Sequence, residues 1–325
     1  MSDAIPAKPT LLVTRRLPPA VEERARRDYA ARLNPDDRIM SPDELIAAAA
    51  DADALLICSS EKMTPAAIAR LPDRVRAIAT FSVGYEHIDV AAARARGIVV
   101  TNTPDVLTDA TADMAMLLLL AASRRAHEGQ ALVRENRWRG WYTTMLLGIQ
   151  CTGKRLGILG MGRIGRAVAQ RARSFGMEIH YYNRSRLPAA LEAGAVFHES
   201  VETFLAASQF LSINCPSTAD TRGLLDEKRI ALLPDGAVVV NTARGDIVDD
   251  EALIAALRSG KVAAAGLDVF AGEPNIHPAY RELDNAFLLP HLGSATHETR
   301  DAMGFTCLDN LDAVFAGREA PNALT

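Results

Sequence analysis

The feature that most constrains the fold of this chain is a glycine-rich stretch near its middle. An apolar segment, residues 156–159, runs directly into residues 160–165, whose sequence GMGRIG has the form G-x-G-x-x-G. Apolar residues recur at helical spacing over residues 163–175, and residues 177–182 have the composition of a strand. The order strand, glycine turn, helix, strand predicts the start of a Rossmann-type parallel sheet.

Each glycine of this turn is expected to serve a separate purpose. Gly160 allows the tight turn out of the strand, Gly162 lets the backbone approach a pyrophosphate, and Gly165 lets the helix pack closely on the sheet. The phosphates would lie at the helix N-terminus, where unpaired N–H groups and the helix dipole favour an anion. The stretch therefore predicts a dinucleotide site, and the alternative is a glycine-rich turn without a ligand.

Length and composition indicate a globular protein of two domains. At 325 residues the chain is long for one ordinary domain. Its 49% hydrophobic and 23% charged residues are typical of a soluble enzyme. A net charge of −4 gives no indication of a nucleic-acid or anionic-membrane surface. The longest apolar run, residues 114–122, is far shorter than the ~20 residues that span a bilayer.

The N-terminus and the cysteines favour a cytoplasmic protein. The first residues lack a basic region followed by an apolar core, so no secretory signal is expected. Cys58, Cys151, Cys215 and Cys307 are scattered and form no C-x-x-C pair. We therefore expect reduced thiols, and neither a disulfide framework nor a metal site.

Strand and helix patterns alternate in both halves of the chain. The first half is predicted to contain strands over residues 10–14, 54–58, 75–80 and 98–101 and helices over 18–29, 42–50 and 89–96. The second half adds strands over residues 195–197, 210–213, 237–241, 263–268 and 287–289, with helices between most of them, including 249–259. Both halves are therefore predicted to be doubly wound parallel α/β sheets.

Two long helices are expected to connect these halves. One, over residues 108–125, begins with acidic and ends with basic residues, and the other, over residues 296–315, is long enough to return to the first half. We therefore predict a flavodoxin-like substrate domain of residues 1–103 plus 292–325. A Rossmann cofactor domain of residues 104–291 is predicted to be inserted in it.

Residues 127–150 have no regular hydrophobic period and carry both tryptophans, Trp138 and Trp141. An irregular aromatic arm between two α/β blocks usually packs on something. A second copy of the chain is the obvious partner, so a homodimer is predicted.

Three polar residues directly follow predicted strands of the second half. Arg244 follows VVVNTA, Glu273 follows the segment GLDVFAG, and His291 follows FLLP. All three should lie on the carboxyl edge of the sheet, where open α/β sheets bind their ligands.

This set of side chains fits hydride transfer from a nicotinamide to a 2-keto acid. An arginine can hold the substrate carboxylate and polarise the keto group. A histidine can protonate the nascent alkoxide near neutral pH, and an adjacent carboxylate orients its ring and favours the imidazolium form. Taken singly, Arg244 could be a turn residue, Glu273 a loop charge and His291 a strand-end histidine. His87 is a weaker candidate acid in the substrate-side loop.

Six segments match a known family: SVGYEHID (residues 82–89), TNTPDVLTDATADMA (101–115), GILGMGRIG (157–165), NTARGDIVD (241–249), AGLDVFAGEP (265–274) and LPHLGSAT (289–296). Over nearly its whole length the chain resembles the D-isomer-specific 2-hydroxyacid dehydrogenases. Within that family it is most similar to the glyoxylate/hydroxypyruvate reductases.

The resemblance implies a role for each group. Arg244 would bind substrate, His291 would be the acid/base, and Glu273 its partner. The backbone amides of Val83 and Gly84 would bind the substrate carboxylate. Trp141 or Trp138 would either reach the partner subunit's active site or pack in the interface. Residues expected at the cofactor are Thr108, Gly160, Gly162, Arg163, Ile164, Gly165, Asn183, Arg184, Ser185, Cys215, Pro216, Thr221, Thr242, Ala243, Arg244, Asp268, His291 and Gly293. Among these, Asp268 would hold the nicotinamide carboxamide, and Cys215 and Pro216 would lie by the adenosine.

The end of the second Rossmann strand indicates which cofactor is preferred. NAD-binding folds place an acidic residue there for the ribose 2′-hydroxyl, whereas this chain has Asn183, Arg184 and Ser185. An amide, a cation and a hydroxyl suit a 2′-phosphate, so NADP(H) is predicted over NAD(H). The alternative is that Asn183 and Ser185 merely form the turn.

The sequence therefore predicts a cytoplasmic NADPH-dependent reductase that converts glyoxylate to glycolate and hydroxypyruvate to D-glycerate in a cleft between its domains. Alternatives on the same scaffold are reductases of bulkier 2-keto acids and D-3-phosphoglycerate dehydrogenase. Formate dehydrogenase is disfavoured because its histidine partner is typically glutamine. A corepressor-like nucleotide sensor is the alternative outside enzymes, although no basic or disordered tail is visible.

Overall fold

The computed structural model describes residues 8–325, which form two compact units. The first unit comprises the chain up to Leu107 together with Ala295–Thr325, and the second comprises Thr108–Ser294. Both boundaries lie a few residues further along the chain than the predicted ones.

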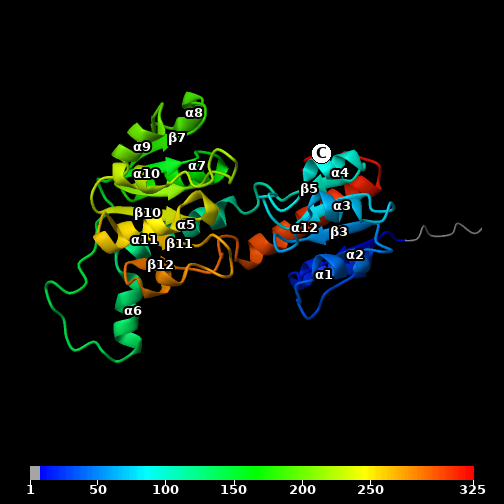
Figure 1. The fold of residues 1–325 in the computed structure, drawn as a ribbon, viewed down its shortest axis with the longest axis horizontal. Coiled ribbons are helices and arrows are strands. Elements are labelled where there is room, and N and C mark those ends of the chain that lie inside the picture. The colour runs from blue at the N-terminus through cyan, green and yellow to red at the C-terminus, as the bar shows by residue number, and fades with distance from the viewer. Residues whose placement is uncertain (1–7) are drawn as a thin grey trace, which may run out of the picture. The chain divides into compact units, whose positions relative to one another are not determined.

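The first unit is built on a five-stranded parallel sheet in the order β2-β1-β3-β4-β5 (Figure 1). This is the flavodoxin-like order. The strands are β1 (Thr10–Val13), β2 (Ala30–Arg32), β3 (Ala54–Ile57), β4 (Ala77–Thr80) and β5 (Val99–Thr101). The helices are α1 (Pro19–Asp28), α2 (Pro42–Ala48), α3 (Pro65–Ala69), α4 (Val90–Ala95) and α12 (His297–Phe315).

Alternating side chains of β1 supply the two cores of this unit. Leu11 and Val13 join the core that α1 and α12 cover, and Leu12 joins the core under α2, α3 and α4. This alternation is the two-residue period of a strand that is buried on both faces. Helix α12 therefore completes a core whose strands come from the other end of the chain.

The second unit contains a seven-stranded parallel sheet in the order β12-β11-β10-β9-β6-β7-β8. The strands are β6 (Arg155–Leu159), β7 (Glu178–Tyr182), β8 (Val196–Phe197), β9 (Phe210–Ile213), β10 (Ala237–Asn241), β11 (Val262–Leu267) and β12 (Ala286–Leu288). The helices are α5 (Thr108–Ser123), α6 (Ala126–Arg134), α7 (Arg163–Ser174), α8 (Ala189–Glu192), α9 (Val201–Ala207), α10 (Glu227–Leu232) and α11 (Asp250–Ser259), with the 3₁₀ turns η1 (Gly245–Ile247) and η2 (Pro278–Glu282). The strand order reverses between β6 and β9, which is the Rossmann switch point.

The predicted fold class is confirmed, and the predicted strands agree with the observed ones within one or two residues. Strand β2 and helix α3 were not predicted. The prediction of an irregular arm over residues 127–150 is wrong in its first part, which is helix α6. None of its side chains is fully buried, and residues 127–129, 131 and 132 are half-buried.

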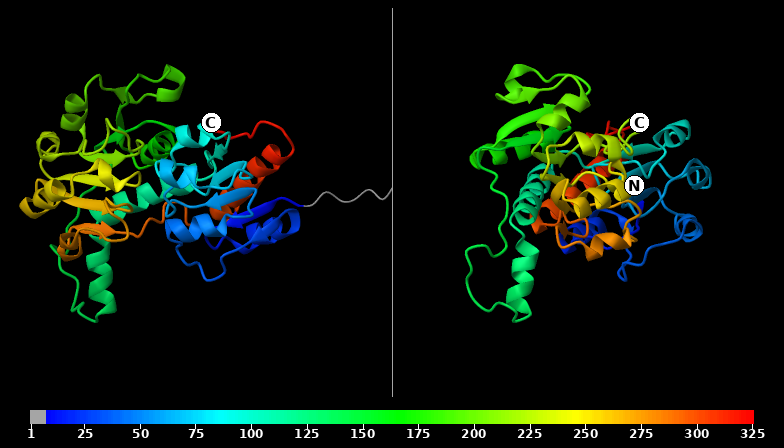
Figure 2. Two further views of the ribbon diagram at one scale, coloured as in Figure 1. Left: turned by 45° about the vertical axis from the view of Figure 1, so that its right-hand side comes forward. Right: turned by 60° about the vertical axis from the view of Figure 1, so that its left-hand side comes forward.

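Figure 2 shows α6 and the loop after it extending away from the sheet of the second unit. Within residues 8–325, no helix is long and apolar enough to cross a membrane.

Candidate active site

The glycine turn has the geometry expected of a dinucleotide site. Gly160 leaves β6 with a φ of 94°, and a Cβ atom there would lie 2.6 Å from the backbone nitrogen of Cys215. Only glycine therefore fits at this position. Gly162 precedes α7, and open space lies where its side chain would be. The N-terminus of α7 can thus be approached by an anion.

Two buried polar atoms at neighbouring strand ends also fit a bound nucleotide. The Oδ1 atom of Asn214, after β9, and the Oγ1 atom of Thr242, after β10, have no hydrogen-bond partner within residues 8–325. Buried oxygens are rarely left unpaired. The residues present therefore fit a nicotinamide cofactor that supplies further partners at this edge.

The polar residues at the end of β7 fall into two groups: Asn183 is hydrogen-bonded within the protein, and Arg184 and Ser185 face solvent. The Oδ1 atom of Asn183 accepts a hydrogen bond of 2.7 Å from the N–H of Met161, which ties this strand to the glycine turn. Arg184 and Ser185 are exposed, and the Arg184 guanidinium makes no hydrogen bond or ion pair with any residue that the structure describes. The carboxyl end of β7 thus presents an unpaired cation and no acidic side chain.

His291 and Glu273 lie in direct contact after strands β12 and β11. The Nδ1 atom of His291 lies 2.8 Å from Oε2 of Glu273, and Oε1 of Glu273 accepts a 2.7 Å hydrogen bond from the N–H of Phe270. Burial opposes ionisation of Glu273, but the bond from His291 and the charges of His291 and Arg244 outweigh it and lower the pKa of this carboxyl. Glu273 is therefore ionised near neutral pH, and His291 donates its Nδ1–H to it.

The backbone around His291 is fixed by Asp268. The Asp268 oxygens accept hydrogen bonds of 2.7 Å from the N–H groups of Leu292 and Gly293, and the His291 N–H donates to the Asp268 carbonyl. Burial raises the pKa of the Asp268 carboxyl, although these N–H groups and the His291 charge oppose the shift. These bonds explain why the chain stays with the second unit past His291.

Arg244 lies next to this pair because β10, β11 and β12 are neighbours in the sheet. The Asn241 side chain shapes its turn, because Nδ2 donates to the Arg244 carbonyl at 2.9 Å and Oδ1 accepts the Ala243 N–H at 3.0 Å. A Cβ atom on Gly245 would lie 1.9 Å from the carbonyl carbon of Phe270. The turn that carries Arg244 therefore packs directly against the loop that carries Glu273.

In the first unit, the loop after β4 presents free backbone donors. The carbonyls of Ser82, Val83 and Gly84 accept hydrogen bonds, whereas the N–H groups of Val83 and Gly84 donate to no residue within the described chain. Two adjacent free N–H groups can bind a carboxylate. His87 is instead a core histidine, since its ring is buried and its Nε2 lies 2.9 Å from Oγ1 of Thr80.

The remaining predicted cofactor contacts lie at the same sheet edge of the second unit or on its helices. Thr221 donates to the Pro216 carbonyl at 2.6 Å, and burial raises the pKa of the Cys215 thiol to about 11. Trp141 and Trp138 are 76% and 54% exposed on the arm of this single chain. Among residues 8–325, no cluster of three or more His, Cys, Asp or Glu side chains could hold a metal ion.

Sequence reasoning missed a cavity of about 290 Å³ beside the histidine. Its lining residues are Phe270, Glu273, Pro274, Ile276, Arg281, Leu288, Leu289, Pro290 and His291. They come from two chain segments without a common pattern, so no sequence signal marks this cavity. The role of Asn241 was also missed, although it belongs to the NTARGDIVD segment.

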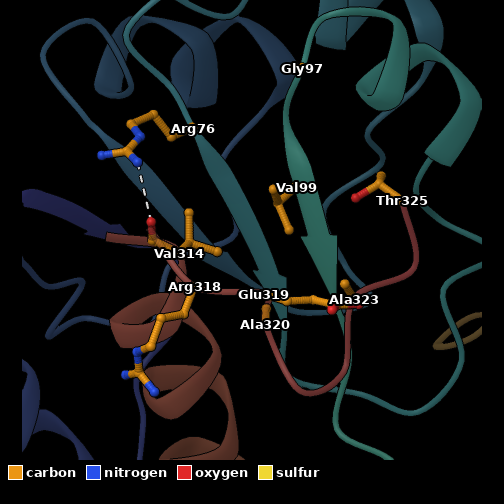
Figure 3. A pocket seen from close by; sticks show the side chains of 9 residues that line it. All are labelled: Arg76, Gly97, Val99, Val314, Arg318, Glu319, Ala320, Ala323 and Thr325. Atoms are coloured by element: carbon orange, nitrogen blue, oxygen red, sulfur yellow. Dashed lines mark hydrogen bonds between the residues drawn. The ribbon is translucent and has the colours of Figure 1, made fainter. Parts of the chain in front are cut away.

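A second cavity, of about 320 Å³, lies in the first unit between β5 and the end of α12 (Figure 3). Its Arg76 donates to the Val314 carbonyl at 3.2 Å, and Arg318 points away from Arg76. Arg76 and Val99 stand at the amino ends of their strands. This is the opposite sheet edge from the Val83–Gly84 loop, so the cavity is not part of the candidate active site.

Comparison with known proteins identifies the family. Residues 116–293 match the family described as the D-isomer specific 2-hydroxyacid dehydrogenase, NAD binding domain. The chain is 46% identical to a glycerate dehydrogenase from Hyphomicrobium methylovorum, over 98% of this chain and 99% of that protein. It is 42% identical to a glyoxylate reductase from Thermococcus litoralis, over 97% of this chain and 96% of that protein.

A solved structure of an NADPH-dependent glyoxylate/hydroxypyruvate reductase from Sinorhizobium meliloti, in complex with NADP and malonate, superimposes with a TM-score of 0.88 at 34% identity. The match covers 98% of this chain and 97% of that one. The chain therefore belongs to the D-isomer-specific 2-hydroxyacid dehydrogenase family, as the sequence motifs predicted. It is an NAD(P)-dependent D-2-hydroxyacid dehydrogenase.

Proposed function

We propose that this enzyme is a reductase of small 2-keto acids that prefers NADPH, converting glyoxylate to glycolate and hydroxypyruvate to D-glycerate. The observation that carries the proposal is the 2.8 Å contact between His291 Nδ1 and Glu273 Oε2. It lies at the carboxyl edge of a Rossmann sheet, one strand away from Arg244. The relatives named glycerate dehydrogenase and glyoxylate reductase support this substrate class.

In this proposal each residue has one task. NADPH, when bound at the glycine turn, supplies the hydride. Arg244 and the free N–H groups of Val83 and Gly84 bind the substrate carboxylate. His291 protonates the keto oxygen as negative charge develops there, and Glu273 holds the ring in place and favours its charged form.

The preference for NADPH rests on Arg184. Its guanidinium is exposed and unpaired within the described chain, and no acid at the end of β7 would repel a 2′-phosphate. Asn183 instead bonds to Met161, so it contributes by shaping the turn. The S. meliloti structure holds NADP, which supports the same preference here.

A homodimer is also part of the proposal. The arm presents exposed apolar side chains, namely Val133, Trp138, Trp141, Tyr142 and Leu147. Such a surface favours burial against another protein surface. A second copy would cover it, and Trp141 of one copy would reach the substrate bound by the other. The four free cysteines support a cytoplasmic location.

The test is a panel of 2-keto acids assayed with NADPH and with NADH by following nicotinamide absorbance. We expect the highest kcat/KM for glyoxylate or hydroxypyruvate with NADPH. A higher value for a bulky or phosphorylated keto acid would refute the substrate assignment, and a clear NADH preference would refute the cofactor assignment. Sedimentation of the enzyme would test the dimer.

A further inference from the structure

The loop that carries Glu273 is held at its far end by a buried tyrosine. Tyr280 is 1% exposed, and its hydroxyl donates a 2.8 Å hydrogen bond to Oδ1 of Asp250 in the first turn of α11. The tyrosine end of this bond is buried and the Asp250 end is half-buried, and a hydrogen bond to a charged carboxylate is stronger than one between neutral groups. Tyr280 therefore fixes residues 278–282 to a helix that the sheet itself supports.

Tyr280 is linked to the active site through Phe270. The two rings meet edge to face, with centroids 5.9 Å apart and planes inclined by 62°. Phe270 in turn supplies the backbone N–H that binds Oε1 of Glu273 at 2.7 Å. The other oxygen of Glu273 holds His291, so the two oxygens connect Phe270 to the acid/base.

The other side of Phe270 is closed by the Arg244 turn. Gly245 leaves no room for even a Cβ atom between the two backbones. Phe270 therefore lies between the Arg244 turn and the Tyr280 ring, and a displacement of Tyr280 opens space on one side only. In a close-packed core such a change moves its neighbour. The movement would shift the Phe270 N–H, and with it the Glu273 carboxylate to which this N–H is bonded.

We infer that Tyr280, through its bond to Asp250, is a positioning residue that sets the orientation of Glu273 toward His291. This inference rests on the proposed role of His291 as the acid. Under this inference, proton donation also depends on the hydroxyl of Tyr280, a group that contacts neither substrate nor cofactor. Loss of the hydroxyl weakens the Glu273–His291 contact without removing either residue.

The chain contains a closely matched control in Tyr29. Its ring is 3% exposed, its hydroxyl donates to an aspartate, Asp312, and it meets Phe315 edge to face at 6.1 Å and 60°. This arrangement lies in the first unit and contacts none of the proposed catalytic groups. Tyr280→Phe and Tyr29→Phe therefore remove the same atom from similar surroundings, although Asp312 also pairs with Arg24, and only the first should affect His291.

Turnover gives one readout. Reduction requires a proton on His291, and the carboxylate of Glu273 orients the ring and favours its charged form. We expect Tyr280→Phe to lower kcat roughly three- to tenfold, the size of one weakened hydrogen bond. The Kd for NADPH should stay unchanged.

Reactivity of His291 with diethyl pyrocarbonate, followed by peptide mass spectrometry, gives a readout that needs no substrate. Only the neutral ring reacts, so Tyr280→Phe should speed modification of His291 and Tyr29→Phe should not. In a Glu273→Gln background Tyr280→Phe should add nothing, because the path to His291 is already broken. If the wild type reduces no 2-keto acid, the proposed function fails and this reactivity still decides the inference.

If Tyr280→Phe folds poorly, variants of Asp250 test the same hydrogen bond from its acceptor side. Asp250→Asn keeps an acceptor oxygen for the phenol and should preserve the His291 reactivity, whereas Asp250→Ala should raise it. Equal His291 reactivity in Tyr280→Phe, Tyr29→Phe and wild type would overturn the inference and leave Tyr280 a purely structural residue. The inference would also be overturned if Tyr280→Phe further increased the rate of His291 modification in the Glu273→Gln background.

Discussion

Arg184 gives the sharpest test of the proposed cofactor preference. Its guanidinium is exposed and has no partner among residues 8–325, so no ion pair must break before it binds a phosphate. We predict that Arg184→Ala lowers kcat/KM for NADPH and leaves kcat/KM for NADH nearly unchanged. NADH lacks the 2′-phosphate and cannot use this contact.

The size of the effect follows from the exposure of the side chain. A hydrogen bond to a charged group contributes about 1.5–3 kcal/mol when it is well protected. Solvent screening at an exposed position reduces this to roughly 1–2 kcal/mol. Since each 1.36 kcal/mol is tenfold, the expected loss in kcat/KM for NADPH is about 5- to 30-fold.

Arg186 is the matched control, two residues further along the same turn. Its guanidinium is occupied by Glu192, with 2.8 and 3.1 Å hydrogen bonds, and lies over the ring of Phe197. Arg186→Ala should lower stability and leave the ratio of NADPH to NADH efficiency as in the wild type. The reasoning is refuted if Arg184→Ala keeps that ratio, or if Arg186→Ala changes it as much.

Three further predictions concern the acid, a close backbone contact and pH. His291→Asn should lose at least about a hundredfold in kcat, as expected for removal of a general acid, with NADPH binding by fluorescence titration retained. Gly245→Ala should reduce both Tm and kcat, because its Cβ would lie 1.9 Å from the carbonyl carbon of Phe270; unchanged kcat would contradict the packing described above. His180 and His198 lie 2.9 Å apart, and burial, with mutual repulsion at His180, lowers the pKa of both rings. Their neutral forms are favoured in the fold, so their contribution to stability is present above about pH 6.5 and is lost as pH falls toward their lower folded pKa values. Urea unfolding should therefore show a greater loss of stability between pH 7.5 and pH 5.5 in the wild type than in His198→Gln.

The buried parallel strands were predictable because their sequences leave few alternatives. The segment Ala237–Asn241 is apolar on both faces and short, as in a strand covered by helices on both sides. Strand β2 was missed because its sequence, AAR, carries no such pattern, and only its parallel pairing with β1 makes it a strand. Tertiary context decides such an edge strand, and local sequence does not.

The approximate site was predictable for a topological reason, and its detailed contacts were not. Arg244, Glu273 and His291 follow neighbouring parallel strands, so they must share one sheet edge. The φ of 57° at His291 and the bond from Phe270 to Glu273 depend on how the loops pack against each other. No pattern of residue types along the chain encodes those contacts.

The discontinuity of the first unit has a consequence for the order in which the protein is made. Strands β1 to β5 leave the ribosome first, but Leu308 and Leu311 of α12 belong to the same core as Leu11 and Val13. This core cannot close until the whole of Thr108–Ser294 has been synthesised. The cofactor unit is continuous and can fold as soon as it emerges. We therefore expect the half of the enzyme that begins the chain to be the last to reach its native state, with its apolar strands exposed to chaperones in the interval.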